Sequence, residues 1–265
     1  MNNLNFIYYL YNLLFMNNIE KEVYDIFNKK KYIKFRKKIN IVDVGCYKGQ
    51  FSLSLSKKFD KKSLNKMKFY LIDPNNKHKN YYKKNLNFNY QFFNYAIDDK
   101  PESKKIFYIN NFYEASGSSL KGDSFKDNKY MKSRTIIKRF LNPINWSSKM
   151  VIKKNVSTIN IYDFCKKNNL DYIDILKIDT EGTEVDIIKG LKKYNKKISI
   201  ICIEIQGNKN KIMKKIDFVN KALKKDFKLV YKKRIWIASF LTDIQSYDFI
   251  YSRVLGVCFL KDFPA

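Results

Sequence analysis

The feature that most constrains this chain is a repeated pattern in which a short β-branched run is followed by a helix-length segment. The first run covers residues 39–44, ends at Gly45 and precedes apolar residues at helical spacing, which predicts a buried strand and then a helix. Strands that alternate with helices pair in parallel through right-handed crossovers, so we expect an α/β fold with a doubly wound, mostly parallel sheet. The predicted strands cover residues 39–44, 68–72, 90–97, 104–109, 156–160, 172–178, 198–205, 227–231, 249–254 and 257–260.

Three segments depart from this pattern. Residues 1–38 carry apolar side chains at near-helical spacing and predict an N-terminal amphipathic helical extension that packs on the body of the protein; a dimerising or membrane-surface helix is the alternative. Residues 110–150 show little periodicity, which predicts a long loop or lid inserted in a domain spanning residues 39–265. The last two predicted strands, joined near Gly256, indicate an antiparallel C-terminal edge hairpin.

The charge of the chain raises the question of a polyanionic partner. There are 53 Lys and Arg against 25 Asp and Glu, a net charge of +28, as in many nucleic-acid-binding proteins. Nearly all of the excess is lysine, however, whereas arginine is the usual residue for bidentate recognition of phosphates and bases. Lysine and asparagine are abundant along the whole chain, as when A/T-rich codons are favoured, and we favour this compositional explanation. Nucleic acid is therefore a possible partner but not the favoured one.

Hydropathy and cysteine usage point to a cytoplasmic protein. No apolar run reaches the ~18–20 residues that cross a bilayer, and the richest stretch, residues 4–16, makes a poor signal peptide. The four cysteines show no C-x-x-C spacing, and a single histidine cannot complete a Cys/His zinc cluster. Scattered thiols of this kind are typical of a reducing compartment. We expect no transmembrane segment, and peripheral membrane contact through residues 1–38 stays open.

The residues after the first predicted strand point to a nucleoside ligand. Asp43, Gly45 and Gly49 form a D-x-G-x-x-x-G pattern where the strand turns into a helix, a place where open α/β sheets bind ligands. The pattern lacks the middle glycine of the pyrophosphate fingerprint, and Asp73 ends the second strand, where it can accept hydrogen bonds from both ribose hydroxyls. A nucleoside without phosphates, with Asp43 near an amino group, describes S-adenosylmethionine better than NAD. The expected cofactor-binding residues are Asp43, Gly45, Cys46, Gly49, Asp73 and Ala96.

The single histidine, His78, lies among polar residues on the predicted helix after Asp73. A catalytic histidine would need a serine or cysteine nucleophile in a recognisable elbow, and the sequence shows none. We therefore expect His78 to face solvent or to lie at the rim of an adenine site, and not to act in catalysis.

The most distinctive string is a predicted strand that ends in several carboxylates. Strand alternation places Lys177 and Asp179 on one face, and Asp179 and Glu181 leave the strand end beside the expected cofactor cleft. Glu184 begins the next helix, where an acid is favoured, and Glu204 ends the following strand, where it could line the same cleft. Carboxylates beside a cationic sulfonium could orient an acceptor hydroxyl and take its proton. The alternatives are structural: Glu184 as a helix cap and Lys177 as the countercharge of Asp179.

Several motifs occur in order along roughly residues 39–206. They are Val42-Asp43-Val44-Gly45 with Gly49, Asp73-Pro74, Ser116-Gly117-Ser118-Ser119-Leu120, Leu176-Lys177-Ile178-Asp179-Thr180-Glu181-Gly182-Thr183-Glu184 with Lys189-Gly190, and Ile203-Glu204. Together they resemble the FkbM family of S-adenosylmethionine-dependent methyltransferases, and the K-I-D-x-E-G-x-E string is the most specific part. The resemblance implies a class I methyltransferase (Rossmann-like) fold and, usually, O-methylation of a hydroxyl on a sugar or natural product. The chain departs from the family where Asp73 replaces the usual glutamate and where bulky or basic residues follow Gly45.

The expected reaction is in-line transfer of a methyl group to an alcohol oxygen of a sugar, glycan or related small molecule. Asp179 is the first candidate for the base or acceptor-orienting residue, Glu181 the second and Glu204 the third. No metal is expected to be required, although a divalent ion stays possible. Two alternatives stay open: an RNA methyltransferase that uses the basic surface, and a non-catalytic basic binding module on the same fold. The residues expected to bind the substrate are Ser118, Ser119, Lys177 and Glu184.

Overall fold

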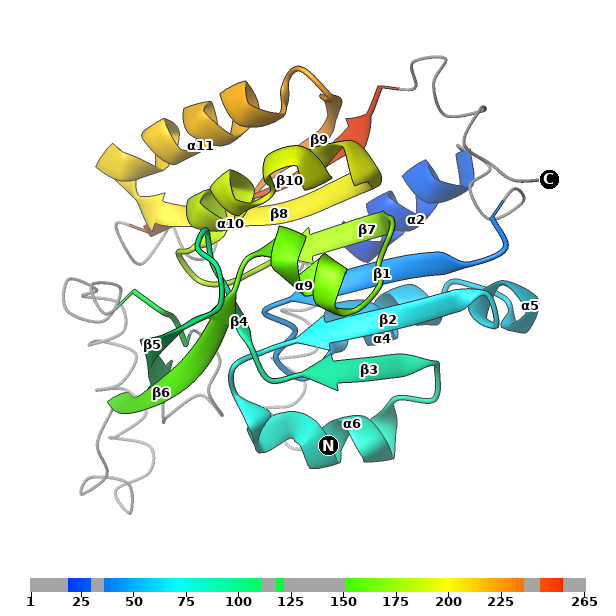
Figure 1. Ribbon diagram of the computed structural model, residues 1–265. Helices are drawn as coiled ribbons and strands as arrows, with labels where there is room; N and C mark the ends of the chain where they lie inside the picture. Colours follow the sequence, from blue (N-terminus) through cyan, green and yellow to red (C-terminus); the bar gives the residue numbers. More distant parts are fainter. Residues whose placement is uncertain (1–18, 30–35, 111–117, 122–150, 236–243, 255–265) are drawn as a thin grey trace, which may run out of the picture.

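A seven-stranded sheet forms the centre of the computed structural model (Figure 1). The structure describes residues 19–29, 36–110, 118–121, 151–235 and 244–254. The strands of this sheet are β1 (Ile39–Val44), β2 (Met67–Ile72), β3 (Tyr90–Phe93), β7 (Ile173–Ile178), β8 (Ile198–Asn208), β9 (Phe227–Ile235) and β10 (Ile244–Arg253). Their order is β3-β2-β1-β7-β8-β10-β9, with parallel pairs as far as β8 and antiparallel pairs on both sides of β10. The predicted α/β fold with a doubly wound, mostly parallel sheet is confirmed.

Helices cover both faces of this sheet (Figure 1). The helices are α2 (Ile19–Lys29), α4 (Gln50–Ser56), α5 (Lys61–Leu64), α6 (Lys79–Asn85), α9 (Ile161–Lys167), α10 (Glu184–Gly190) and α11 (Lys209–Leu223), with 3-10 turns η1 (Asn76–His78) and η3 (Lys192–Lys197). Because successive strand residues point to opposite faces, Val42 and Leu176 pack with α9, α10 and α11, whereas Ile41 and Ile175 pack with α2, α4 and α6. Because both faces of these strands are buried, their sequences are continuous apolar runs and do not alternate between apolar and polar residues.

Residues 19–29 of the predicted N-terminal extension form α2, an amphipathic helix. Ile19, Val23 and Phe27 lie one turn apart on its apolar stripe and are buried against the sheet beside α4. The other residues of that extension, apart from 36–38, lie outside the described part of the chain. Among the described helices, none is long and apolar enough to cross a membrane.

A second, three-stranded sheet is built from β4 (Ala96–Ile97), β5 (Ser103–Asn110) and β6 (Val151–Ile159). β6 lies between the other two strands, parallel to β4 and antiparallel to β5. The prediction of one strand over residues 90–97 is therefore wrong. The main-sheet strand ends at Phe93 because the chain crosses to the second sheet, where Ala96 is buried in a separate small core. The predicted insertion falls between β5 and β6, and most of it lies outside the described residues.

The antiparallel edge of the main sheet is confirmed, but its strands differ from the predicted hairpin. β10 begins at Ile244, earlier than the predicted strand over 249–254, and lies between β8 and β9. The predicted partner over residues 257–260 falls outside the described residues, and β9 takes the edge position instead. Phe249 and Ile250 are buried because β10 is an internal strand, and this burial explains why both residues are apolar. Their apolar character alone does not predict which strands pair with β10.

Candidate functional site

The carboxyl ends of β1, β2 and β7 meet at one edge of the sheet, where the strand order reverses (Figure 1). Across this region Asp43 of β1 is in register with Lys177 of β7, and Lys177 is in register with Cys202 of β8. One step further along, Glu204 is in register with Asp248 of β10. Cys202 packs in the core between the sheet and helices α2 and α4. Side chains in register with it, or two residues further along a strand, point to the same face, so this row of side chains lies on the face that α2 and α4 cover.

The turn after β1 is held between β2 and β7. The Gly45 N–H donates to the Ile72 carbonyl at 2.9 Å, and the Asp179 N–H donates to the Val44 carbonyl at 3.0 Å. Gly45 has a φ of 76°, and a Cβ placed on it would lie 1.8 Å from the carbonyl oxygen of Asp179. The backbone of Asp179 therefore approaches Gly45 so closely that no side chain fits at position 45.

Two more residues of this turn have left-handed backbone. Gly49 has a φ of 70°, and the nearest atom to an added Cβ is Leu86 Cδ1 at 3.4 Å, so conformation and not space favours glycine there. Tyr47 has a φ of 49° although it is a bulky aromatic residue. Few residues other than glycine adopt this region, and those that do occur preferentially at functional sites.

Asp73 lies just beyond the end of β2 with its carboxylate fixed by two main-chain donors. The Tyr47 N–H donates to Oδ2 at 3.0 Å, and the Asn75 N–H donates to Oδ1 at 2.7 Å. Each carboxylate oxygen has a further lone pair, and two such oxygens match the two hydroxyls of a ribose. Burial raises the pKa of Asp73 to about 7, against the effect of the two N–H donors.

Asp43 links this acid to the end of β7. Its side chain is 2% exposed and accepts a hydrogen bond from Ser52 Oγ at 2.6 Å. Burial raises the pKa of Asp43 to about 6, and the negative charge of Asp179 acts in the same direction. The charge of Asp43 in turn raises the pKa of Asp73. Three acids from three adjacent strand ends therefore lie within electrostatic range of one another.

The structure brings together the three residues that the sequence offered for catalysis. Burial, together with the charges of Asp179 and Glu184, raises the pKa of Glu181 to about 8. Burial also raises the pKa of Glu204 well above its ordinary value, and the charges of Asp179 and Asp248 contribute. Glu181 adopts a left-handed φ of 56°, which is a second strained residue at this edge.

Lys177 is the countercharge of this cluster. Its Nζ lies 3.0 Å from Asp179 Oδ2, and its side chain is 5% exposed whereas that of Asp179 is 35% exposed. Burial lowers the pKa of Lys177, but the surrounding acids, led by Asp179, raise it above its usual range, so the lysine is charged. The side chain predicted to bind substrate thus turns toward Asp179, as the structural alternative expected.

Two polar residues that the sequence did not indicate hold Glu204. Ser246 Oγ and Gln206 Nε2 donate to Oε1 of Glu204 at 2.6 and 2.9 Å. Ser246 comes from β10, a strand far along the chain, so no local pattern could have identified it. Within the described residues, no group of three or more His, Cys, Asp or Glu side chains is arranged to hold a metal ion.

Glu184, another residue predicted to bind substrate, lies beside this cluster, since its charge acts on Glu181. The buried Glu184 accepts a hydrogen bond from the Gly182 N–H at 2.5 Å and closes the turn before α10. Ser119 is also buried, and its main chain pairs with Tyr108 of β5. Lys121, which follows the Ser118–Ser119 segment, forms an ion pair with Asp186 of α10, with Nζ 2.7 Å from Oδ2.

The structure also defines the surroundings of Cys46, Ala96 and His78. Cys46 is buried beside Tyr82, with its Sγ 3.5 Å from the tyrosine hydroxyl. Ala96 packs in the core of the second sheet, and it is Asn94 whose Nδ2 donates to the Asp73 carbonyl at 3.0 Å. His78 is 7% exposed, and its ring lies edge-on to the ring of Tyr47 with centroids 4.8 Å apart, so the expectation that it faces solvent is wrong. Its alternative position at the rim of an adenine site stays a prediction.

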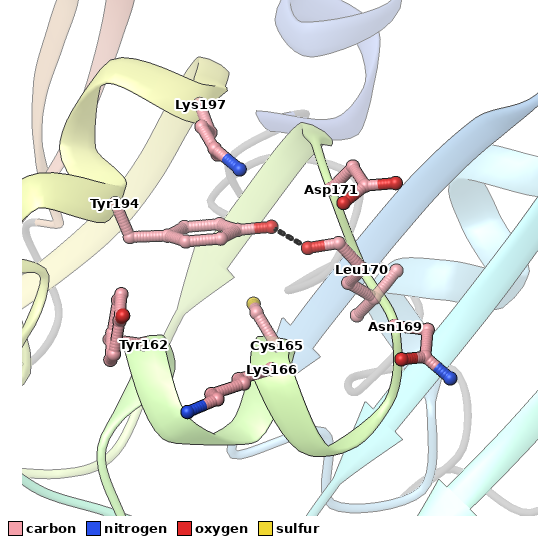
Figure 2. A pocket seen from close by; sticks show the side chains of 8 residues that line it. All are labelled: Tyr162, Cys165, Lys166, Asn169, Leu170, Asp171, Tyr194 and Lys197. Carbon is pink, nitrogen blue, oxygen red and sulfur yellow. Dashed lines mark hydrogen bonds between the residues drawn. The ribbon is translucent and has the colours of Figure 1, made fainter.

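A separate pocket of about 330 Å³ lies at the opposite edge, where β7 and β8 begin (Figure 2). Figure 2 shows the Tyr194 hydroxyl directed at the Leu170 carbonyl, to which it donates a hydrogen bond. Burial raises the pKa of the adjacent Cys165 thiol to about 12, so this thiol is not reactive. Ligands of open α/β sheets bind at the carboxyl ends of the strands, so this pocket is not the candidate site.

The fold and this edge define the class of the protein. The main sheet has seven strands, of which the last two are antiparallel, and acids lie at the strand ends on both sides of the place where the strand order reverses. These features place the chain among the class I methyltransferases. The sequence matches the Methyltransferase FkbM domain over residues 43–232, and the chain belongs to this family. The resemblance drawn from the motifs is therefore confirmed.

Comparison with individual proteins adds two structures of distant similarity. One is a proposed RNA methyltransferase from Pyrococcus horikoshii, with 9% identity, a TM-score of 0.41 and coverage of 91% of this chain and 87% of that one. The other is a precorrin-6y C5,15-methyltransferase from Geobacter metallireducens, with 9% identity, a TM-score of 0.37 and coverage of 88% and 89%. None of the curated proteins matches the sequence.

Proposed function

We propose that this protein transfers a methyl group from S-adenosylmethionine to a hydroxyl of a sugar, glycan or related small molecule. The observation that carries the proposal is the convergence of Asp179, Glu181 and Glu204 beside the site formed by Asp43 and Asp73. Methyl transfer to an alcohol requires a group that orients the hydroxyl and takes its proton, and a carboxylate does both.

The residues at the first two strand ends fit the cofactor. Asp73, with both oxygens set by main-chain donors, would hold the ribose hydroxyls, and the turn at Gly45 would carry the adjoining part of the molecule. Asp43 would lie near the amino group of the methionine portion, where its charge is favourable. When bound, S-adenosylmethionine supplies an electrophilic methyl group on a cationic sulfonium.

The acids at the third and fourth strand ends divide the work on the acceptor. Asp179 is 35% exposed and meets Lys177 through Oδ2, so we assign it the role of accepting the hydroxyl proton. With its pKa raised to about 8, Glu181 is mostly protonated at neutral pH and can donate a hydrogen bond to the acceptor. Acid and base roles are commonly divided between neighbouring carboxyl groups.

Binding of the ribose is expected to depend on pH through Asp73. Its pKa is raised from 3.8 to about 7, so the free folded protein holds this proton more tightly than the unfolded chain, and the contribution of Asp73 to stability declines between about pH 4 and pH 7. The ionised carboxylate is the better acceptor for ribose hydroxyls, so adenosine affinity should rise about ten-fold from pH 6 to pH 8. Calorimetric titration with adenosine measures this, because adenosine lacks the ionisable methionine portion.

The Asp73→Asn variant is the control for this titration. It should bind adenosine weakly at both pH values, because the amide presents only one acceptor oxygen. If the variant keeps the same pH dependence as the wild type, another group, such as Asp43, sets it.

The proposed reaction is tested with a methyl-labelled cofactor and two panels of acceptors, saccharides and RNA. Label should appear on saccharide hydroxyls, with a KM for the acceptor that changes little with salt. Label on RNA, with an affinity that falls steeply as salt is raised, would establish the RNA alternative that the net charge of +28 suggests. Cofactor binding without transfer to any acceptor would indicate a binding module instead.

A further inference from the structure

A buried tyrosine of α6 contacts the turn that follows β1. Tyr82 is fully buried, and its hydroxyl donates a hydrogen bond to the main-chain carbonyl of Tyr47. Its ring packs against Phe92 with centroids 5.2 Å apart, a contact that a phenylalanine would also make. Packing therefore explains the aromatic ring of Tyr82 but not its hydroxyl. A buried hydroxyl is costly unless it has a hydrogen-bond partner, and the carbonyl of Tyr47 is such a partner.

Tyr47 is fixed on both sides of its strained Cα. Its carbonyl accepts the Tyr82 hydrogen bond, and its N–H donates to Asp73 Oδ2 at 3.0 Å. The φ between these two groups is 49°, which an aromatic residue adopts only at a cost. Without the hydroxyl, the peptide can rotate toward an ordinary conformation, and the N–H then leaves the Asp73 carboxylate.

We propose that Tyr82 is a positioning residue for the cofactor: its hydroxyl keeps Tyr47 in the left-handed conformation and so aims the Asp73 carboxylate at the ribose. The inference rests on the proposed function, in which Asp73 holds that ribose. Burial raises the pKa of Tyr82 beyond its usual range, so the hydroxyl remains a neutral donor at all working pH values.

The chain contains a matched control for this contact. Tyr194 is also buried, its hydroxyl also donates to a main-chain carbonyl, that of Leu170, and it also lies beside a buried cysteine, Cys165 (Figure 2). That contact lies at the amino ends of β7 and β8, away from Asp73. Removing either hydroxyl should have a similar effect on stability, whereas only the Tyr82 hydroxyl should affect the cofactor.

The experiment compares Tyr82→Phe with Tyr194→Phe by calorimetric titration with adenosine and with S-adenosylmethionine. Tyr82→Phe should raise Kd about ten-fold and raise the KM for the cofactor, with kcat at saturation within about two-fold of the wild type. The pH midpoint of adenosine binding should also rise, because the Tyr47 N–H lowers the pKa of Asp73. Tyr194→Phe should leave Kd and midpoint unchanged. Among the described residues, Asp43, Cys46 and Tyr82 interact electrostatically with Asp73, and His78 and Lys48 lie against the Tyr47 ring.

A second pair of variants isolates the backbone strain. Glycine adopts a φ near 49° without cost, so in a Tyr47→Gly background the further change Tyr82→Phe should alter Kd by less than about two-fold. This pair decides the matter if Tyr82→Phe alone does not fold: equal affinities support the proposal, and a ten-fold loss within the pair overturns it.

Other outcomes are equally decisive. If Tyr82→Phe binds like the wild type with the same pH midpoint, or if Tyr194→Phe weakens binding as much, Tyr82 has only a structural role and the inference is wrong. If the wild type binds neither adenosine nor S-adenosylmethionine, the proposed function fails first, and this inference with it.

Discussion

The Asp179→Asn variant is expected to lower kcat by about 10²–10⁴-fold while the Kd for S-adenosylmethionine stays within about two-fold of the wild type. The asparagine keeps the shape of the side chain, an acceptor oxygen for Lys177 and the main-chain contacts with Val44 and Gly45. What it lacks is the basic oxygen that takes the acceptor proton. Single-turnover transfer of labelled methyl, with a parallel calorimetric titration of the cofactor, separates the two effects.

Asp186→Asn is the matched control. Asp186 lies on α10, shortly after the acidic strand end, and forms ion pairs with Lys121 and Lys189 at 2.7 and 3.4 Å. It has no place in the proposed chemistry, so its variant should keep turnover within about two-fold. Unchanged turnover in Asp179→Asn would pass the role of base to Glu181 or Glu204.

The Gly45→Ala variant is expected to lose about 2–5 kcal/mol of unfolding free energy. A left-handed conformation costs a residue with a Cβ about 1–2 kcal/mol, and forcing an atom into a filled space costs about 1–3 kcal/mol more. Here the added Cβ would lie 1.8 Å from the Asp179 carbonyl oxygen, so β1 and β7 must separate at the proposed site. Urea denaturation followed by circular dichroism measures the loss, and any variant that still folds should transfer methyl groups poorly because Asp179 has moved.

Gly207→Ala provides the comparison at a strand position of β8. The nearest atom to an added Cβ is Ile212 Cβ at 3.4 Å, an ordinary contact. The unfolding free energy should therefore change by no more than about 1 kcal/mol. Equal losses in the two variants would contradict the argument that the Asp179 backbone is what requires glycine at position 45.

The parts of the site that the sequence predicts are those set by one strand and its end. Alternation along a strand fixes the face of a side chain, so the sequence alone places Lys177 and Asp179 together. The parallel order of the strands then brings Asp43, Asp73 and Asp179 to one edge. These are local patterns combined with one rule of topology, and both are readable in the chain.

The parts that the sequence does not predict depend on contacts between distant segments. Ala96 and Ile97 form a strand only because residues 158 and 159 lie beside them. The partner of Glu204, Ser246, comes from a strand whose place between β8 and β9 no local pattern reveals. His78 likewise contacts the ring of Tyr47, which lies in a different turn. The polar residues beside His78 in the sequence give no sign of this contact, so they did not predict its burial.

The hydrogen bond from Tyr82 to the strained residue at position 47 has a consequence for the evolution of this turn. A homologue with glycine at the position of Tyr47 gains nothing from the hydroxyl, because its backbone adopts the left-handed turn unaided. Selection for tyrosine at the position of Tyr82 should therefore relax to phenylalanine or an aliphatic residue in those lineages. The two positions are expected to covary, although they are 35 residues apart in the sequence.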